Sequence, residues 1–446
     1  MVSWRPDAIA LVASTASSRQ VDALLLLVCA TFAFAVVVGV PFFYGGMSGR
    51  AGAIAAFRAA VSGAAVVVLL ALVGGYGMMV GPALIPGVVG RPDWGLGSAL
   101  AKSAGDPYPL AQAAYLIVLS AVAVAILGAA VASRVTLRAW MVFVALWSVL
   151  VLFPAFFAVF ALNDGWAVAG LRVIDFGGAL PVSLAAGSAA AGVILACGRR
   201  SHPPAGTQSL PLSSIGGALV WFGWFGITVG SEGAVDAYTG LIWINTLVAS
   251  AGGVLAWVVV DRVMLRRPTI TSALCGAVSG LVAITPGSGV VAPGWALILG
   301  VLAALACASM VDVAARARFG VPMMIGVVHI VASLVGLLFV GLFATGGGMI
   351  DSGNFDLFVG QAIAGFGVAL YSFAVSSGIA LALRFSIGLA RVGYGADRGI
   401  TDEISARSGR RVPSEHEEPH TAVDGADGAP TGPVTGTERP GGDGRG

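Results

Sequence analysis

The sequence predicts an all-α integral membrane protein with eleven membrane-spanning helices. Three observations support this fold class: the composition, the spacing of the apolar segments and the distribution of arginine. Hydrophobic residues make up 57% of the 446 residues and charged residues only 10%, and the mean hydropathy is +0.92. A soluble domain carries about 25% charged residues, so most of this surface must face lipid rather than water. The net charge of +2 gives no reason to expect a nucleic-acid partner.

The apolar segments have the length that a lipid bilayer requires. A hydrocarbon core of about 30 Å is crossed by roughly 20 apolar residues in a helix. Runs of this kind lie at about 22–45, 53–81, 110–132, 138–161, 178–198, 213–230, 238–260, 270–285, 293–313, 323–345 and 357–389. The eighth run is short, and glycine and polar residues interrupt the fifth and sixth.

Arginine alternates between successive loops and predicts the orientation in the membrane. Cytoplasmic loops collect basic residues. The segments after odd-numbered runs contain Arg50, Arg134, Arg138, Arg199, Arg200, Arg262, Arg266, Arg267, Arg316, Arg318, Arg391 and Arg398. The segments after even-numbered runs carry mainly acidic residues, with Arg91, Lys102 and Arg172 as exceptions. We therefore expect a multi-pass protein of the cell (plasma or inner) membrane, with its N-terminus outside and its C-terminus in the cytoplasm.

Composition divides the chain into three regions. Residues 1–21 precede the first apolar run and are predicted to be an extracellular segment, with a cleaved leader before about residue 20 as the alternative. Residues 22–395 form the predicted membrane domain. From about Asp402 the chain is rich in Gly, Pro, Thr, Arg and acidic residues, and we expect residues 396–446 to be a disordered cytoplasmic tail.

The sequence contains no residue set for catalysis, a cofactor or a metal. The four cysteines lie singly in apolar runs, without CxxC or Cys/His metal spacing. The GxSxG, HExxH and Walker motifs are also absent. We therefore expect no enzyme activity and no cofactor. The chain either moves a solute passively or by ion coupling, or it senses one.

Few polar residues lie in the apolar runs, and each is a functional candidate because lipid makes it costly. His329 is the single histidine of the runs. It is either a hydrogen-bonded core residue or part of a functional site. Asp175 precedes the fifth run, where a helix N-cap is its favoured role.

Six short motifs occur in order along the chain and resemble those of the ammonium transporter (Amt/Mep/Rh) family. They are PFFYGGM at 41–47, VIDFGG at 173–178, GWFG at 223–226 followed by Gly230-Ser231, Asn245-Thr246, ITPGSG at 284–289 and GVVH at 326–329. Each motif alone is weak, but their order and spacing over about residues 22–395 are specific.

The resemblance implies an architecture and a function. Spans 1–5 and 6–10 would form an inverted repeat, with a peripheral eleventh helix. The family forms homotrimers with a pore in each subunit, through which ammonia derived from captured ammonium crosses an apolar lumen past two histidines. A regulatory partner of the PII type is also implied, although the tail diverges from the family's pattern.

The resemblance also assigns site residues, and several of them depart from the family. Ser231, Phe160 and Trp224 fall on the outer recognition site, with Phe160 where the family has Trp. The two gate phenylalanines fall on Leu119 and Ile227. His329 falls on the second pore histidine, whereas Ser183 replaces the first. Asp175 is structural.

These departures leave three functions open. An ammonium transporter is the leading hypothesis. A non-conducting ammonium sensor and a channel for another small solute are the alternatives, because a serine cannot relay a proton near neutral pH as histidine can. A solute transporter of a different fold is a further possibility, which a structure without the five-helix repeat would support.

Overall fold

The computed structural model describes residues 6–198, 209–264, 268–317 and 320–389, with the backbone alone for residues 6–17 and 50. The predicted tail at 396–446 lies outside these residues, as do several arginines of the predicted cytoplasmic loops. The first half contains α1 (Pro6–Met47), α2 (Gly49–Leu70), η1 (Ala71–Gly75), α3 (Tyr76–Val80), β1 (Ala83–Ile85), β2 (Val89–Gly90), η2 (Trp94–Leu96), α4 (Gly97–Lys102), α5 (Tyr108–Val131), α6 (Leu137–Trp147), η3 (Ser148–Leu152), α7 (Phe153–Phe160), η4 (Trp166–Gly170), η5 (Leu180–Leu184) and α8 (Ala185–Cys197). The second half contains α9 (Leu210–Gly230), α10 (Thr239–Met264), α11 (Ile270–Ile284), α12 (Pro293–Arg316), α13 (Val321–Phe343), α14 (Met349–Ser352) and α15 (Asp356–Ser386).

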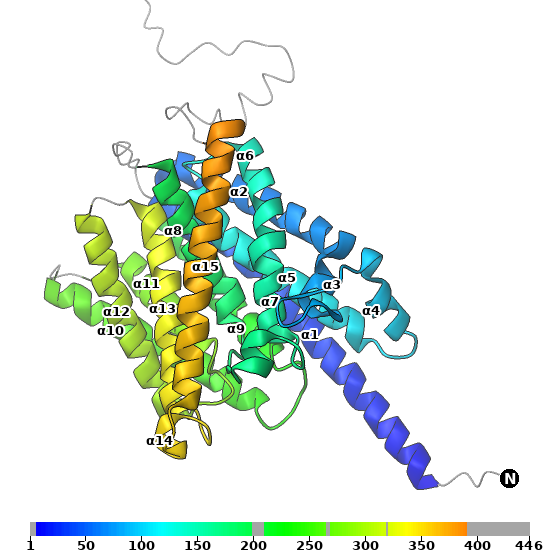
Figure 1. Cartoon of the computed structure of the whole chain (residues 1–446). Helices are drawn as coiled ribbons and strands as arrows, with labels where there is room; N and C mark the ends of the chain where they lie inside the picture. The colour runs from blue at the N-terminus through cyan, green and yellow to red at the C-terminus, as the bar shows by residue number, and fades with distance from the viewer. Residues whose placement is uncertain (1–5, 199–208, 265–267, 318–319, 390–446) are drawn as a thin grey trace, which may run out of the picture. The chain divides into compact units, whose positions relative to one another are not determined.

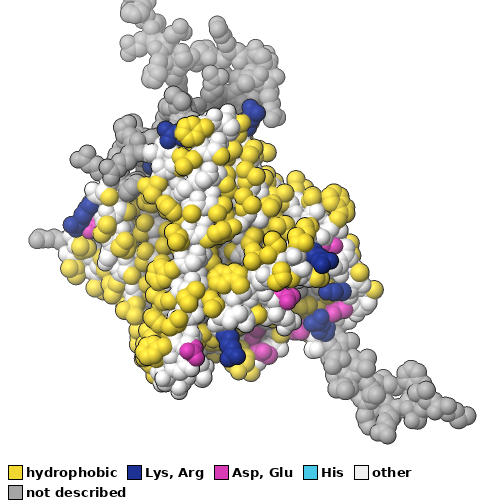
Figure 2. All heavy atoms as spheres, in the orientation of Figure 1, with side chains coloured by type: hydrophobic (Ala, Val, Ile, Leu, Met, Phe, Trp, Pro, Cys, Tyr) yellow, Lys and Arg dark blue, Asp and Glu magenta, His cyan; other side chains and the backbone are white. Residues whose placement is uncertain are grey.

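The prediction of a multi-pass helical membrane protein is confirmed. Within the described residues, ten helical segments are long and apolar enough to cross a membrane, and each matches a predicted run to within a few residues. The eighth run forms α11, which has only 15 residues and is about 22 Å long at 1.5 Å per residue. This helix is shorter than the hydrocarbon core, so the count of eleven spans stays a prediction. Hydrophobic side chains cover most of the face seen in Figure 2, and charged side chains lie toward its ends.

Helix α1 is longer than its predicted run of 22–45, because it already begins at Pro6. It packs against α9, α5 and α2, and its N-terminal part runs past the neighbouring helices (Figure 1). The C-terminal helix α15 lies along α8 and α13. The two groups of helices, α1 to α8 and α9 to α13, meet mainly through α1 with α9 and α8 with α13.

Three of the spans contain a π-helical turn, which the sequence pattern does not predict. These turns are η1, η3 and η5. A Cβ atom at Gly75 in η1 would lie 2.5 Å from the ring of Phe153, the first residue of α7. The turns in the second and fourth spans are therefore part of one close contact between these spans.

Two irregular segments inside the bundle satisfy each other's backbone groups. The amide of Phe176 donates to the carbonyl of Pro286 at 3.0 Å, and the amide of Gly177 donates to that of Thr285 at 2.9 Å. Non-helical backbone is tolerated at membrane depth only where it is buried in protein or lines a cavity. The DFGG and TPGSG segments therefore form one structural unit between the helices.

The loop after α3 folds into a short antiparallel pair of strands, where the sequence predicts only a loop. Ala83 pairs with Gly90 and Ile85 with Val89. Pro86 and Gly87 form the turn, and Gly87 adopts a φ of +78°, which favours glycine.

Candidate functional site

The end of the bundle at which α5 begins and α9 ends is called the outer end here, following the orientation expected from the arginines. At the opposite end, Arg134 donates to the carbonyl of Gly198 at 3.2 Å and Arg384 to that of Ala196 at 2.9 Å. Both arginines thus bind carbonyls at the C-terminal end of α8, which have no partner within the helix.

Three oxygen atoms cluster at the outer end of α9. The Tyr115 hydroxyl, from α5, donates to the backbone carbonyl of Ile227 at 2.5 Å and lies 2.9 Å from the Ser231 hydroxyl. Ser231 Oγ donates to the same carbonyl at 2.8 Å. The last carbonyls of a helix carry the negative end of its dipole, so this cluster suits a cation. A Cβ atom at Gly230 would collide with the Tyr115 ring, which explains glycine at this position.

The gate candidates Leu119 and Ile227 follow directly inward of this cluster. Leu119 lies one helical turn inward of Tyr115 on α5, and Ile227 lies one turn inward of Ser231 on α9. Both side chains are completely buried. Both candidates therefore lie one turn inward of the cluster, on the two helices that the hydrogen bond between the Tyr115 hydroxyl and the Ile227 carbonyl links.

His329 lies within α13 and its side chain is buried, at 1% exposure. The centroid of its ring is 6.3 Å from that of Tyr44 and 6.4 Å from that of Trp224. Neither ring nitrogen has a hydrogen-bond partner among the described residues, and the Tyr44 hydroxyl has none. Buried polar groups are nearly always hydrogen-bonded, so the two free nitrogens make His329 a candidate for contact with a solute or with water.

Trp224 lies beside His329 and not beside Ser231. Its indole donates to Thr285 Oγ1 at 2.9 Å and is completely buried. Trp224 precedes Ser231 by seven residues on α9, which is about 10 Å along the helix axis. The outer position that the resemblance implies for Trp224 stays a prediction, and the rise of the helix separates it from Ser231.

Ser183 lies in the π-helical turn η5, where its hydroxyl is buried without a hydrogen-bond partner among the described residues. The start of this span is held by Asp175, whose carboxylate accepts from the amides of Ala179 at 2.7 Å and Leu180 at 2.8 Å. Asp175 precedes these amides by four and five residues and η5 starts after Ala179, so the carboxylate holds the helix start from the preceding turn and not as the N-cap that the sequence favours. The carboxylate therefore fixes the backbone that carries Ser183.

Phe160, the last residue of α7, packs against this same segment. A Cβ atom at Gly178 would lie 2.9 Å from the Phe160 ring, and Gly178 adopts a φ of +72°. The ring also stacks on Phe156 at 5.5 Å. The half-buried Phe160 thus lies at the entrance to the span that contains Ser183.

Acidic groups surround the outer end of α9. Burial, together with the hydrogen-bonded Asp236 carboxyl, raises the pKa of Glu232 to about 7. Glu232 also accepts from the Thr239 hydroxyl at 2.7 Å. The Asp22 carboxylate on α1 accepts from the amide of Val235 at 2.9 Å, which ties α1 to this loop.

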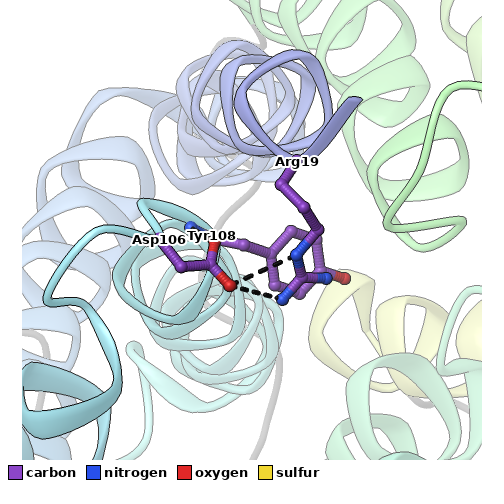
Figure 3. A network of polar contacts seen from close by, with 3 residues as sticks. All are labelled: Arg19, Asp106 and Tyr108. Atoms are coloured by element: carbon purple, nitrogen blue, oxygen red, sulfur yellow. Dashed lines mark hydrogen bonds and ion pairs between the residues drawn. The ribbon is translucent and has the colours of Figure 1, made fainter. Parts of the chain in front are cut away.

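A second contact fastens α1 to the start of α5. The Arg19 guanidinium donates to the Asp106 carboxylate at 2.7 Å and lies over the Tyr108 ring, 4.1 Å from its centroid (Figure 3). The arginine lowers the pKa of Asp106 below its ordinary value. A Cβ atom at Gly233 would lie 2.7 Å from the Tyr108 hydroxyl oxygen, and Gly233 has a φ of +71°. Both observations explain glycine at this position. These contacts hold the loop that carries Ser231 against α1 and α5.

Sequence reasoning missed Tyr115 and Glu232 at the outer site. The signal for Tyr115 was its spacing of four residues from Leu119, which places both on one helix face. No group of three or more His, Cys, Asp or Glu side chains in the described parts of the chain is arranged to hold a metal ion.

Comparisons with known proteins agree with this arrangement. The sequence model described as "Ammonium Transporter Family" matches residues 23–401. The chain belongs to the ammonium transporter family. An ammonium transporter of Mycobacterium tuberculosis is 31% identical to this family member, over 87% of this chain and 90% of that protein. The ammonium transporter Amt1 of Archaeoglobus fulgidus is 32% identical, over 79% of this chain and 90% of that protein.

Solved structures show the same fold for this member of the ammonium transporter family. A point mutant of Mep2 from Candida albicans superposes with a TM-score of 0.75 at 25% sequence identity, covering 86% of this chain and 89% of that one. Mep2 from Saccharomyces cerevisiae has a TM-score of 0.75 at 24% identity, covering 86% of this chain and 90% of that one. The further possibility of a different fold is thereby excluded.

Proposed function

We propose that the protein is an ammonium transporter that conducts ammonium-derived ammonia across the cell membrane through a pore in each subunit. The observation that carries this proposal is the buried His329 imidazole with both nitrogens unpaired, in a chain of the ammonium transporter family. Transport through such a pore is not enzyme catalysis and requires no cofactor.

The outer site would capture the ammonium cation. The Ile227 carbonyl accepts from the hydroxyls of Ser231 and Tyr115, so the oxygen lone pairs of both hydroxyls remain free for the cation at the negative end of the α9 dipole. Ammonium has only hydrogen-bond donors, so carbonyl and hydroxyl oxygens match it. Phe160 offers an aromatic face, although the interaction of a cation with Phe is weaker than with Trp. Ionised Glu232 adds negative charge beside Ser231.

The pore would discriminate by charge. Leu119 and Ile227 present only apolar side chains inward of the capture site. A cation that passes them loses its hydrogen bonds to water without gaining others, which costs much free energy. Neutral ammonia loses little in the same passage, so the proton stays outside. We assign Trp224 with His329 and Ser183 to the pore, because the Trp224 indole lies beside the imidazole.

The assembly and its partners follow from the family. We propose a homotrimer, with an inverted repeat of five spans in each subunit and α15 outside it. A regulatory protein of the PII type would bind the cytoplasmic loops. The predicted orientation, with the N-terminus outside and the C-terminus in the cytoplasm, is part of this proposal.

Complementation is the experiment that tests the function. The chain is expressed in a strain that lacks all ammonium transporters and grown on low ammonium, and uptake of labelled methylammonium is measured. We expect growth and saturable uptake. Wild-type protein that reaches the membrane but gives neither would refute transport, and ammonium binding without uptake would favour the sensor.

A further inference from the structure

Ser333 is a buried serine of α13 that none of the motifs includes. Its side chain is completely buried, and its hydroxyl has no hydrogen-bond partner among the described residues. It follows His329 by four residues, one turn closer to the outer end, so the two side chains lie on neighbouring parts of one helix face. A buried hydroxyl without a partner is costly, and the position therefore requires an explanation.

Close packing of α8 on α13 determines what lies opposite Ser333. A Cβ atom at Gly187 would lie 2.9 Å from the Gly326 carbonyl oxygen and 3.1 Å from His329 Cβ. A Cβ atom at Gly326 would lie 3.1 Å from the Gly187 carbonyl oxygen and 3.6 Å from Ala190 Cβ. Increasing residue numbers on α8 thus meet decreasing numbers on α13, and the two helices are antiparallel.

This register places Ser183 and Ser333 at the same level. Ser183 precedes Gly187 by four residues, one turn toward the outer end, and η5, which carries it, also contacts α13. Because Gly187 packs on His329, one turn outward on α8 corresponds to one turn outward on α13. Two buried hydroxyls without partners among the described residues therefore lie at one level of the bundle, one turn outward of the imidazole.

We propose that Ser183 and Ser333 form a neutral hydroxyl pair that binds the translocated amine, ammonia or methylamine, one turn outward of His329. The proposal rests on the proposed transport function, and it adds Ser333 as a residue that determines specificity. Each hydroxyl has one donor and two acceptor lone pairs, so the pair accepts from an N–H group and donates to the amine lone pair. Neither hydroxyl titrates near neutral pH, so the amine is held there without proton exchange.

Serine-to-alanine variants test the pair. Ser183→Ala, Ser333→Ala and the double variant are compared with Ser376→Ala in proteoliposomes. Ser376 is equally buried, and its hydroxyl has no hydrogen-bond partner among the described residues. It lies on α15, one turn from Ser372, whose hydroxyl donates to the Ala185 carbonyl on another face of α8. Ser376 is therefore the control for a buried hydroxyl outside the proposed pair. Methylammonium uptake and its inhibition by ammonium are measured. We expect each pore variant to lose about 3- to 10-fold in uptake rate, as for one neutral hydrogen bond, and to change the preference for ammonium over methylammonium.

The double variant and the control separate binding from structure. We expect the double variant to lose little more than the stronger single variant, because the two hydroxyls hold one molecule together. Ser376→Ala should keep the wild-type rate and preference. A structural role for Ser333 alone would lower the amount of folded protein without changing the preference between the two substrates, and that result would overturn the pair.

Failure of the pair is distinguishable from failure of transport. Wild-type rate and preference in Ser333→Ala, with a transporting wild type, would overturn the pair and leave the function intact. If the wild-type protein does not transport, a high-resolution density map of the protein determined in the presence of ammonium shows whether the pair binds a solute. Density between the two hydroxyls that disappears in the double variant supports the pair, and a wild-type map without it refutes the pair.

Discussion

Tyr115 shows how one hydroxyl alters the outer site at the scale of a single residue. Its ring packs on Gly230, while its hydroxyl bonds to the Ile227 carbonyl and touches Ser231. We expect Tyr115→Phe to keep the packing and to raise the KM for methylammonium about 2- to 10-fold, the loss of one neutral hydrogen bond. Uptake kinetics measure this change.

A second tyrosine provides the matched control for this measurement. The Tyr371 hydroxyl donates to the Leu150 carbonyl at 2.7 Å, and the side chain is exposed on α15. Tyr371→Phe removes the same hydroxyl group from a helix that does not contribute to the outer site, and we expect an unchanged KM for methylammonium. Equal effects of the two variants would show that the Tyr115 hydroxyl does not contact the cation.

His329 and Ser183 test the pore at the same scale. Removing the imidazole in His329→Ala leaves no hydrogen-bonding group at this position, and we expect uptake to fall by about 10-fold or more or to lose its selectivity, as for the loss of a hydrogen bond to the solute. Ser183→His restores an imidazole pair and should change the rate or the selectivity. Methylammonium uptake in proteoliposomes measures both. If neither substitution changes transport, the pore assignment is wrong.

The loop between α9 and α10 is the element that links pH to capture. The pKa of Glu232 is raised from its ordinary value of 4.5 to about 7 by burial and by the Asp236 carboxyl. Raising the pH through 7 ionises Glu232 beside Ser231, and a negative charge attracts the cation. We expect the KM for methylammonium to fall as the pH rises through the pKa of Glu232, since methylammonium itself stays protonated there.

Two amide substitutions check this pH dependence. Glu232→Gln removes the titrating group, and we expect a nearly flat KM profile. Asp351→Asn, in α14, should keep the wild-type profile. The fold disfavours ionised Glu232, so this residue lowers the stability as the pH rises from 4.5 to about 7, and thermal unfolding of Glu232→Gln should lack that contribution. If Glu232→Gln kept the wild-type pH dependence of the KM, the titrating group would be a residue other than Glu232.

The contact between α8 and α13 is the second element with a clear consequence. A side chain at Gly187 would meet the Gly326 carbonyl oxygen at 2.9 Å and His329 Cβ at 3.1 Å. We expect Gly187→Ala to destabilise the protein by about 1–3 kcal/mol, as for other overpacked cores, and to reduce uptake because the imidazole moves. Thermal unfolding in detergent and uptake measure the two effects.

Glycine elsewhere provides the comparison for Gly187. A Cβ atom at Gly378 on α15 would meet nothing within 4 Å. Alanine favours an exposed helix interior over glycine by up to about 1 kcal/mol, so Gly378→Ala should keep or raise the stability. If both variants were less stable than the wild type, the loss would come from replacing glycine in a helix and not from the contact between α8 and α13.

The elements were largely predictable and their irregularities were not. The helix ends follow from apolar run length and from the charged residues that bound each run, so predicted and observed limits agree closely. The π-helical turns and the contact of Tyr115 with Ser231 depend on which helices meet, and a linear pattern contains no such information. The contact of Trp224 with His329 depends on the same meeting of helices. The motif of Trp224 is shared with Ser231, but the helix separates the two residues.

Most of the acidic and basic groups that hold the helix ends lie at opposite ends of the membrane domain. Asp22 within α1 and Asp106 and Glu232 in loops lie at the outer end, where Arg19 pairs with Asp106, whereas Arg134 and Arg384 bind the last carbonyls of α8 at the other end. Arginine is costly to translocate, so the end that collects it is expected to stay in the cytoplasm. The arrangement in space therefore agrees with the alternation of arginine between loops along the sequence.

Reporter fusions test this orientation at the scale of the molecule. Alkaline phosphatase folds only outside the cytoplasm, and we expect activity when it is fused after Asp236, in the loop after α9. A fusion after Met264, at the end of α10, differs by one span and should be inactive. A C-terminal green fluorescent protein should fluoresce. The reverse pattern would turn the pore around, so that the cluster of Tyr115 and Ser231 would face the cytoplasm and release the solute instead of capturing it.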